Sequence, residues 1–304
     1  MPTITAPLTE RRLLGIGLAL AAYFMFAGID SSAKWLALGG IPAAQVVFLR
    51  YAVHLVLVLG INVPQTGLAT LARTASFKTQ AVRAAMLLGA TTCNFIAVRY
   101  LPLTVTGAIA FTMPLILCAL SVPLLGETVG WRRWTAICVG FLGILIIVRP
   151  GTEAFHPAAL LCLAAAVFSA FYFILTRRMA ASDSAATQQF YVGLFATVLL
   201  LPIAIPLWVW PSDPTVWVAF FTVGLFGFIG HQLITVASSF APASVLAPFS
   251  YLQIIFMAAS SWLIFNQPPD VWLYVGAPIV IGSGLYIWLR ERALAKAAPS
   301  LTTA

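Results

Sequence analysis

Apolar residues along this chain fall into ten continuous runs, each about long enough to cross the hydrocarbon core of a bilayer as a helix. The runs do not alternate apolar and polar residues with period two, which favours helices over a β-barrel. Turns that contain Gly or Pro separate most of them. The pattern predicts an all-α integral membrane protein with transmembrane helices at 13–36, 43–62, 81–100, 103–125, 130–148, 157–177, 188–208, 215–236, 243–265 and 271–289.

The composition supports a membrane protein over a soluble one. Hydrophobic residues make up 62% of the chain and charged residues 8%, whereas soluble domains contain about 45–50% apolar and about 25% charged residues. The net charge is +8, but the basic residues stand at the ends of apolar runs, so we expect the lipid bilayer and no nucleic acid as a partner. The four cysteines lie inside apolar runs without ligand-like spacing, so we expect no disulfide framework, no metal site and no cofactor.

Lys and Arg are distributed unequally between the two predicted membrane faces. The face that carries the N-terminus collects most of them, while the opposite face keeps only Lys34, Arg99 and Arg149, and Arg50 lies within a span. Because cytoplasmic segments are enriched in Lys and Arg, this asymmetry predicts a multi-pass protein of the bacterial inner membrane with both termini in the cytoplasm. The basic residues of the predicted cytoplasmic face are Arg11, Arg12, Arg73, Lys78, Arg83, Arg132, Arg133, Arg177, Arg178, Arg290, Arg292 and Lys296.

Two segments of the chain, 101–127 and 241–267, align with each other without a gap. They lie 140 residues apart, and five spans separate the fourth helix from the ninth, so the second copy enters the membrane in the opposite orientation. Inverted repeats of this kind enclose a midplane cavity in many transporters and exchange inward-open and outward-open forms. We therefore predict two inverted five-helix repeats, 12–149 and 150–290, with cytoplasmic tails at 1–11 and 291–304.

Several features together resemble a known family. The basic residues Lys34 and Arg178 close the first helix of each half, Arg50 lies in the second helix, and a Gly-Glu pair follows the fourth helix at 126–127. With the ten predicted helices, this combination resembles the drug/metabolite transporter superfamily, and more narrowly its EamA type, over almost the whole chain. Gln267 departs from the family pattern, which often has an acid there, so we assign that position no charge-dependent role.

The resemblance implies a basket of eight core helices around a central substrate cavity. The fifth and tenth helices would then lie outside this basket as packing or dimer contacts. It also implies a transporter and not an enzyme, acting on a small-molecule substrate as a monomer or homodimer. The family includes exporters of amino acids, aromatic ones among them, and transporters of other metabolites, so the fold does not fix the cargo.

Arg50 and His54 are candidate binding residues because charged and polar groups at membrane depth are costly and usually face a cavity or a partner. They are four residues apart and share one face of the second helix. In one interpretation Arg50 binds a substrate carboxylate with His54 beside it. In the other, Arg50 snorkels outward or bonds to helix-end carbonyls and holds the fold together. The resemblance favours this second interpretation, because family members with different substrates share an arginine of this type.

Three polar residues in other spans are further candidates for the binding site. Asn94, near the middle of the third helix, offers a donor and an acceptor to a zwitterion, or else bonds to a neighbouring helix. His231 and Gln232 in the eighth helix occupy the repeat positions of Thr91 and Thr92. This correspondence is consistent with a common cavity for both pairs, and a buried packing histidine explains His231 at least as well.

Aromatic residues stand at matched positions of the two halves. Phe111 and Tyr251 would place two rings around an amino-acid side chain, with Gln253 available for its polar end, although core packing explains such rings equally well. Pro114 and Pro248 remove backbone donors near the middle of their spans and are candidate hinges.

Acidic residues that could couple transport to an ion gradient are few. Asp30 and Glu127 stand near span ends, which favours facilitated transport, although His54 or His231 can titrate. The predicted function is an inner-membrane transporter that exports amino acids, with broad specificity, by alternating access through a central cavity. The same fold could instead export nucleosides, sugars or lipophilic drugs. A membrane enzyme is disfavoured because the three histidines, at positions 54, 156 and 231, are scattered along the chain.

Overall fold

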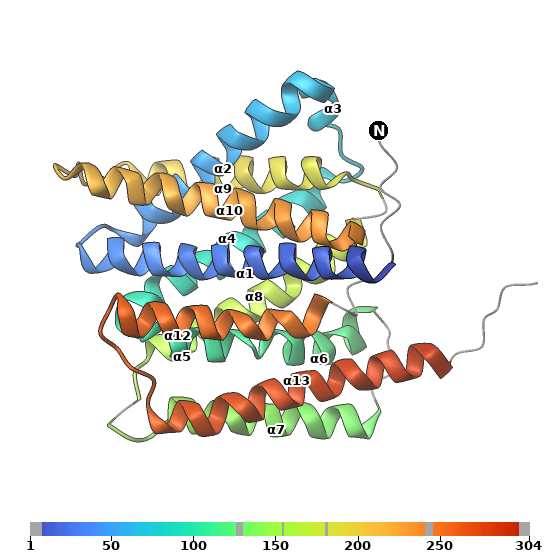
Figure 1. Ribbon diagram of the computed structural model, residues 1–304. Helices are drawn as coiled ribbons and strands as arrows, with labels where there is room; N and C mark the ends of the chain where they lie inside the picture. The colour runs from blue at the N-terminus through green and yellow to red at the C-terminus, as the bar shows by residue number, and fades with distance from the viewer. Residues whose placement is uncertain (1–7, 126–129, 154, 180–181, 241–245, 298–304) are drawn as a thin grey trace, which may run out of the picture.

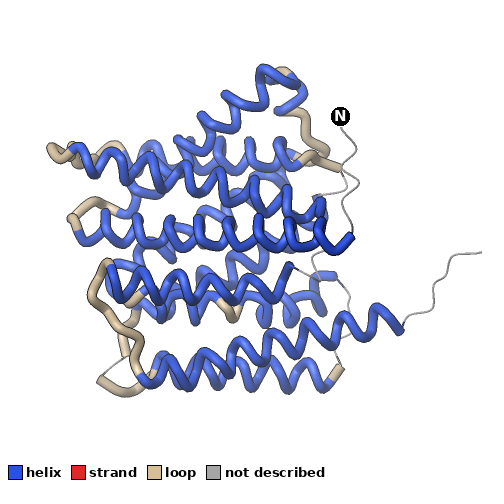
Figure 2. Tube along the Cα trace, in the orientation of Figure 1, coloured by secondary structure: helices blue, strands red, loops and turns tan. Residues whose placement is uncertain are grey.

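The computed structural model describes residues 8–125, 130–153, 155–179, 182–240 and 246–297, and within these ranges all regular structure is helical. Figure 2 shows the helices running side by side, with short loops at the two ends of the bundle. The elements are α1 (Leu8–Leu38), α2 (Ala43–Thr66), α3 (Leu68–Leu71), α4 (Phe77–Tyr100), α5 (Leu103–Ala110), α6 (Met113–Leu125), α7 (Trp131–Val148), α8 (Ala158–Met179), α9 (Ala185–Ala204), α10 (Pro214–Phe240), η1 (Ala247–Leu252), α12 (Gln253–Leu263) and α13 (Val271–Ala297).

Eight of the described segments are long and apolar enough to cross a membrane, which agrees with the predicted all-helical membrane fold. Two shorter apolar helices, Trp134–Val148 and Phe249–Leu263, stand where the fifth and ninth spans were predicted. The third span begins at Phe77, four residues earlier than predicted, because Ser76 caps it: its Oγ accepts a hydrogen bond from the backbone N–H of Thr79 at 3.3 Å. The apolar pattern thus located the helices better than their ends.

The span predicted at 103–125 is not one continuous helix. α5 ends and α6 begins at Met113, with Phe111 and Thr112 in a turn between them. In the ninth predicted span, of which residues 243–245 lie outside the described ranges, the 3₁₀ helix η1 gives way to α12 at Gln253. Gln253 is the repeat partner of Met113, so both aligned segments change their helix at the same position.

Reciprocal contacts between glycines and phenylalanines join α1 to α10. A Cβ at Gly28 of α1 would lie 2.7 Å from the ring of Phe226, and a Cβ at Gly230 of α10 would lie 2.5 Å from the ring of Phe26. Each glycine therefore seats an aromatic ring of the opposite helix, as small residues do at helix contacts in membranes. This contact holds together the two helices that carry Asp30 and His231.

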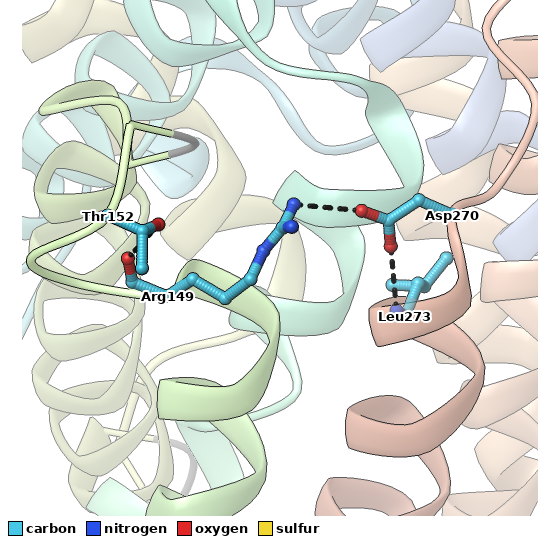
Figure 3. Close-up of polar contacts among 4 residues, drawn as sticks. All are labelled: Arg149, Thr152, Asp270 and Leu273. Carbon is cyan, nitrogen blue, oxygen red and sulfur yellow. Dashed lines mark hydrogen bonds and ion pairs between the residues drawn. The ribbon is translucent and has the colours of Figure 1, made fainter.

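A second close pair, α7 and α13, lies at the lower edge of the bundle in Figure 1. A Cβ at Gly276 would lie 2.6 Å from the carbonyl oxygen of Gly143, so the two backbones meet directly. At the end of this pair, Arg149 Nη2 and Asp270 Oδ2 form a salt bridge of 2.9 Å, and the other carboxylate oxygen accepts the N–H of Leu273 at 2.9 Å (Figure 3). The fifth and tenth predicted helices thus pack against each other.

The buried apolar residues form two main clusters. One joins α1, α2, α4, α8, α9 and α10 with single residues of α5 and α12, and the other joins α4, α5, α7, α8 and α13 with partly buried residues of η1 and α12 packed against it. The guanidinium of Arg50 lies against two aromatic residues of the first cluster, Tyr51 and Phe95.

Candidate functional site

Arg50 points into the bundle and not towards the membrane surface. Its Nη1 donates to Thr91 Oγ1 at 2.5 Å and to Tyr51 Oη at 3.2 Å. Its guanidinium lies 4.9 Å from the ring centroid of Tyr51 and 5.7 Å from that of Phe95, within the range of cation–π attraction. On α10, Gly227 leaves space beside it, since a Cβ there would lie 3.6 Å from Arg50 Nε. Snorkelling, one of the two structural roles considered for this arginine, is therefore not observed.

Asp30 of α1 brings an acidic group to the same region. Its Oδ1 accepts a hydrogen bond from Asn94 Nδ2 at 2.8 Å, and its carboxylate interacts electrostatically with Arg50. The placement of Asp30 at a span end was wrong: the span continues to Leu38, which at 1.5 Å per residue puts Asp30 about 12 Å inside it. Asn94 makes the interhelical hydrogen bond considered above, and that bond holds a charged group of the site.

Two histidines extend the cluster. The side chain of His54 is 5% exposed, lies beside Gln189 of α9 in the lining of one small cavity, and has no hydrogen-bond partner at its Nε2. The ring centroid of His231 lies 6.4 Å from that of His54. The ring centroid of Phe228 lies 5.8 Å from that of His54, and the ring centroid of Phe26 lies 5.3 Å from that of His231. Because buried polar atoms are nearly always paired, the free Nε2 is a group that a ligand can satisfy.

The cavity among these side chains is small. Its volume is about 10 Å³, and its lining includes Arg50, Tyr51, His54, Gln189 and His231. That is room for about one water molecule, so the structure is closed around the site. An organic cargo can enter only after the surrounding helices move apart.

A larger cavity of about 490 Å³ lies between α7 and α13 and opens to the surface. It is lined mainly by apolar side chains, around Trp131 and Val139 on α7 and between Pro278 and Tyr286 on α13. None of the predicted site residues lines it. We place the candidate site at the charged cluster instead, because ionisable groups at membrane depth are costly and are usually functional.

Phe111 and Tyr251 meet each other but lie outside the charged cluster. Their ring centroids are 5.1 Å apart, with planes at 61°. Both belong to the second apolar cluster, where Tyr251 Oη would lie 1.8 Å from a Cβ at Gly284 of α13. Gln232 and Gln253 are half-buried, and neither lines the small cavity. The structure thus brings Arg50, His54, His231 and Asn94 together and leaves these four residues elsewhere.

The two candidate hinge prolines stand at the starts of their elements. Pro114 is the second residue of α6, and Pro248 is the second residue of η1. A missing backbone N–H costs little in the first turn of a helix, so each proline stands beside the interruption of its span and does not kink a continuous helix. Their role as hinges stays a prediction, supported by the interruption that each of them adjoins.

Besides Asp30, two residues of the site, Tyr51 and Gln189, were not predicted as binding residues. Tyr51 stands next to Arg50 in the chain, and its Oη shares a hydrogen bond of 2.8 Å with Thr91 Oγ1. Gln189 contacts His54 from α9. The repeat alignment is a sequence signal that points to this region. It matches Thr91 of α4 with His231 of α10; Thr91 accepts a hydrogen bond from Arg50, and His231 lines the small cavity beside Arg50.

Comparison with known proteins decides the family. The chain matches the EamA-like transporter family over residues 13–149 and again over 156–289. This chain belongs to the EamA-like transporter family. With its bacterial relatives and its apolar helices, this EamA protein is a multi-pass transporter of the bacterial inner membrane.

Curated relatives of this EamA protein have different cargoes in their names. A riboflavin transporter of Vibrio cholerae is 30% identical over 88% of this chain and 90% of its own length. A pseudopaline exporter, CntI, of Pseudomonas aeruginosa is 28% identical over 88% of this chain and 93% of its own length. An S-adenosylmethionine uptake transporter of Rickettsia prowazekii is 30% identical over 63% of this chain, and the match spans 65% of that protein. Free amino acids are in none of these names.

A solved structure shows the same fold. One crystal structure aligns with this EamA protein at a TM-score of 0.62 and 18% identity, covering 94% of this chain and 99% of that one. At this identity the likeness concerns the arrangement of the helices and not the cargo.

Proposed function

We propose that this EamA protein moves a small metabolite with a zwitterionic amino-acid group and an aromatic ring across the inner membrane. Transport occurs by alternating access of two inverted halves, 12–149 and 150–290, with both termini in the cytoplasm. The observation that carries the proposal is the placement of opposite charges inside the bundle: Asp30 accepts a hydrogen bond from Asn94 and interacts electrostatically with Arg50. Arg50 is suited to a carboxylate, and Asp30 is suited to an ammonium group.

Aromatic groups around the charges support a cargo with a ring. Phe228 and His231 stand near His54, Phe26 stands near His231, and Phe95 and Tyr51 stand near Arg50. Ring faces and edges stack on aromatic cargo, while the unpaired Nε2 of His54 offers one polar contact. Free aromatic amino acids fit this description, and so does an amino-acid derivative such as the S-adenosylmethionine in the name of one group of relatives.

The closed site supports alternating access. A cavity of about 10 Å³ admits no cargo, so the same residues must be exposed to each side in turn. Export, the direction expected from the sequence, is one of two directions in the names of relatives, which include uptake transporters and an exporter. The direction of transport is therefore set by the concentration gradient of the cargo or by a coupled ion. Asp30 is the buried acid that would bind such an ion.

Counterflow in proteoliposomes tests the cargo. Proteoliposomes that contain the purified protein are preloaded with one unlabelled compound. The same compound in labelled form, either tryptophan, S-adenosylmethionine or riboflavin, is then added outside at equal concentrations. We expect counterflow of at least one of the two zwitterions, and a reduction of about tenfold or more in Arg50→Gln and Asp30→Asn. Arg99→Gln is the matched control, since Arg99 is exposed at the end of α4.

Substrate analogues separate the two charges. Tryptophan methyl ester lacks the carboxylate and N-acetyltryptophan lacks the ammonium group. The wild type should reject both, and Arg50→Gln should lose its preference for the free acid over the ester. Counterflow that ignores both modifications would contradict the zwitterion site.

A second candidate is a ring-bearing cargo without an amino-acid group. The riboflavin transporter relative, which aligns over 88% of this chain, and the aromatic residues of the site favour it. Riboflavin counterflow without counterflow of either zwitterion would establish this alternative. Absence of flux for every compound in the panel would overturn the cargo proposal as a whole.

A further inference from the structure

Lys34 is a buried cation near the end of α1. Its side chain is 1% exposed, and its Nζ donates to the backbone oxygen of Leu101 at 2.6 Å and to Gln267 Oε1 at 2.8 Å. The ammonium group also lies 5.3 Å from the ring centroid of Phe265. Lys34 and Leu101 belong to the first half of the chain, and Gln267 belongs to the second. One side chain therefore ties the two halves together.

The chain after α12 is folded so that Gln267 meets this lysine. Asn266 has a φ of 52°, a left-handed conformation that Asn tolerates better than most residues. The reversal lets the N–H of Gln267 bond to the oxygen of Ser261 at 2.9 Å, while Ser261 Oγ donates to the oxygen of Gln267 at 3.0 Å. Ser261 is fully buried, so the backbone of Gln267 is fixed to the end of α12.

The matching contact occurs in the other half. Arg178 occupies the position of Lys34 when the first helices of the two halves are aligned, and it stands at the end of α8. Its Nη2 donates to the backbone oxygen of Leu124 in the last turn of α6. In both cases a basic residue near the end of the first helix of one half contacts the other half. Lys34 of α1 contacts Gln267, just after α12, and Arg178 of α8 contacts Leu124, in the last turn of α6.

The two contacts lie at opposite ends of the bundle. In Figure 1 the last turns of α1 and α12 are at the left, and those of α6 and α8 are at the right. The contacts also differ in strength, because Lys34 is buried whereas Arg178 and Leu124 are exposed. A buried bond to an ammonium group is stronger than the same bond in water.

We propose that Lys34 with Gln267 and Arg178 with Leu124 are two latches that close opposite ends of the transport path, and that each breaks in turn during transport. This inference rests on the alternating access of the proposed function. Closure of both latches accounts for the small volume of the site. The neutral amide of Gln267 keeps the Lys34 latch breakable, because a carboxylate in this buried place would bind the ammonium group more tightly.

Substitutions at Gln267 shift the latch in opposite directions. Gln267→Glu adds a charge and should tighten it, whereas Gln267→Leu removes the acceptor at similar size and should loosen it. The readout is the rate at which an impermeant maleimide labels a single cysteine in a background without the four native cysteines. Thr104→Cys reports the Lys34 end, since Thr104 is 1% exposed on α5, and Ile174→Cys reports the Arg178 end, since Ile174 is 3% exposed on α8.

The two variants should change labelling in a crossed pattern. In Gln267→Glu we expect the Thr104→Cys reporter to react about tenfold more slowly and the Ile174→Cys reporter to react faster, and in Gln267→Leu the reverse. Arg178→Gln should speed the labelling of the Ile174→Cys reporter alone. Arg99→Gln, at the same end as Lys34, is the control and should change neither rate. The latch would be overturned if the Thr104→Cys reporter is labelled by the maleimide at the same rate whether position 267 is Gln, Glu or Leu.

Failure of the latch and failure of the proposed cargo give different results. Crossed labelling without flux of any panel compound keeps the latch and rejects the cargo. Flux without any labelling change rejects the latch and keeps the cargo. If Lys34→Met, the most direct variant, does not fold, the two Gln267 variants decide the question without it.

Discussion

Phe111 and Tyr251 occupy equivalent positions of the two aligned segments, and their rings pack edge to face with centroids 5.1 Å apart. Each ring stands where its segment changes from one helix to the next. The two interruptions therefore meet in space. The backbone at an interruption between two helices can bend. This aromatic contact is therefore a point about which α5–α6 and η1–α12 can move.

Overpacking at Gly284 tests the Tyr251 contact. A Cβ at Gly284 would lie 1.8 Å from Tyr251 Oη, so Gly284→Ala should lower the stability by about 1–3 kcal/mol. Tyr251→Phe removes the clashing oxygen and should restore part of the loss in the double variant. Thermal unfolding in detergent measures both effects. Gly282→Ala, whose Cβ would meet nothing within 4 Å, is the control. Equal melting temperatures for Gly284→Ala and the control would contradict the packing.

The helices and the repeat could be predicted from the sequence, but the assignment of side chains to the two apolar clusters could not. The repeat matched Phe111 with Tyr251, and the two rings were candidates for the cargo site, with core packing as the alternative. The pair instead faces α13, because Gly284 leaves room for the Tyr251 hydroxyl, and no periodicity in the sequence announces such a space. The depth of Asp30 was missed for a related reason. The position of Asp30 along its span does not show that Asn94 of another helix donates a hydrogen bond to it.

Gly227 tests whether the space beside Arg50 is used by the cargo. A Cβ at Gly227 would lie 3.6 Å from Arg50 Nε, an ordinary contact, so Gly227→Ala should transport nearly normally. Gly227→Leu would fill the space and should reduce counterflow by about tenfold or more, through steric exclusion. Gly17→Leu is the control, because Gly17 is exposed and a Cβ there would meet nothing within 4 Å. Unchanged flux in Gly227→Leu would move the site elsewhere.

Asp183 should make the stability depend on pH. This buried side chain joins the loop before α4 to the loop before α9, accepting hydrogen bonds from Thr74 Oγ1, the N–H of Ala75 at 3.0 Å and Gln80 Nε2 at 2.7 Å. Burial on its own raises the pKa of Asp183, but these bonds, with one from Ser182, outweigh it and lower the pKa. The stabilisation is therefore present above the unfolded pKa of about 3.9 and is lost as the pH falls through the lower folded pKa.

Asp183→Asn measures that contribution. At pH 7 the variant should be less stable by about 2 kcal/mol, since hydrogen bonds to charged groups are the stronger ones. The difference in melting temperature from the wild type should shrink as the pH approaches 3. Asp213→Asn is the comparison, because Asp213 also has a lowered pKa, from a bond with the N–H of Thr215, but is exposed. A pH-independent gap between wild type and Asp183→Asn would contradict the assignment.

Asp270 has two separable roles at the start of α13. Oδ2 pairs with Arg149 at 2.9 Å, and Oδ1 accepts the N–H of Leu273 at 2.9 Å as a helix cap. The two side chains of the ion pair are 30% and 50% exposed, so the pair should contribute about 0–1 kcal/mol. Asp270→Asn keeps a capping oxygen and loses only the ion pair, whereas Asp270→Ala loses the cap as well, worth about 1 kcal/mol.

The expected order of stability is wild type, then Asp270→Asn, then Asp270→Ala. The double variant with Arg149→Gln should show a coupling below about 1 kcal/mol between Arg149 and Asp270, and salt should reduce it because exposed charges are screened. Thermal unfolding at low and high salt measures the order and the coupling. If Asp270→Asn destabilises as much as Asp270→Ala, the ion pair and not the cap fixes the start of α13, and the tie between α7 and α13 is electrostatic.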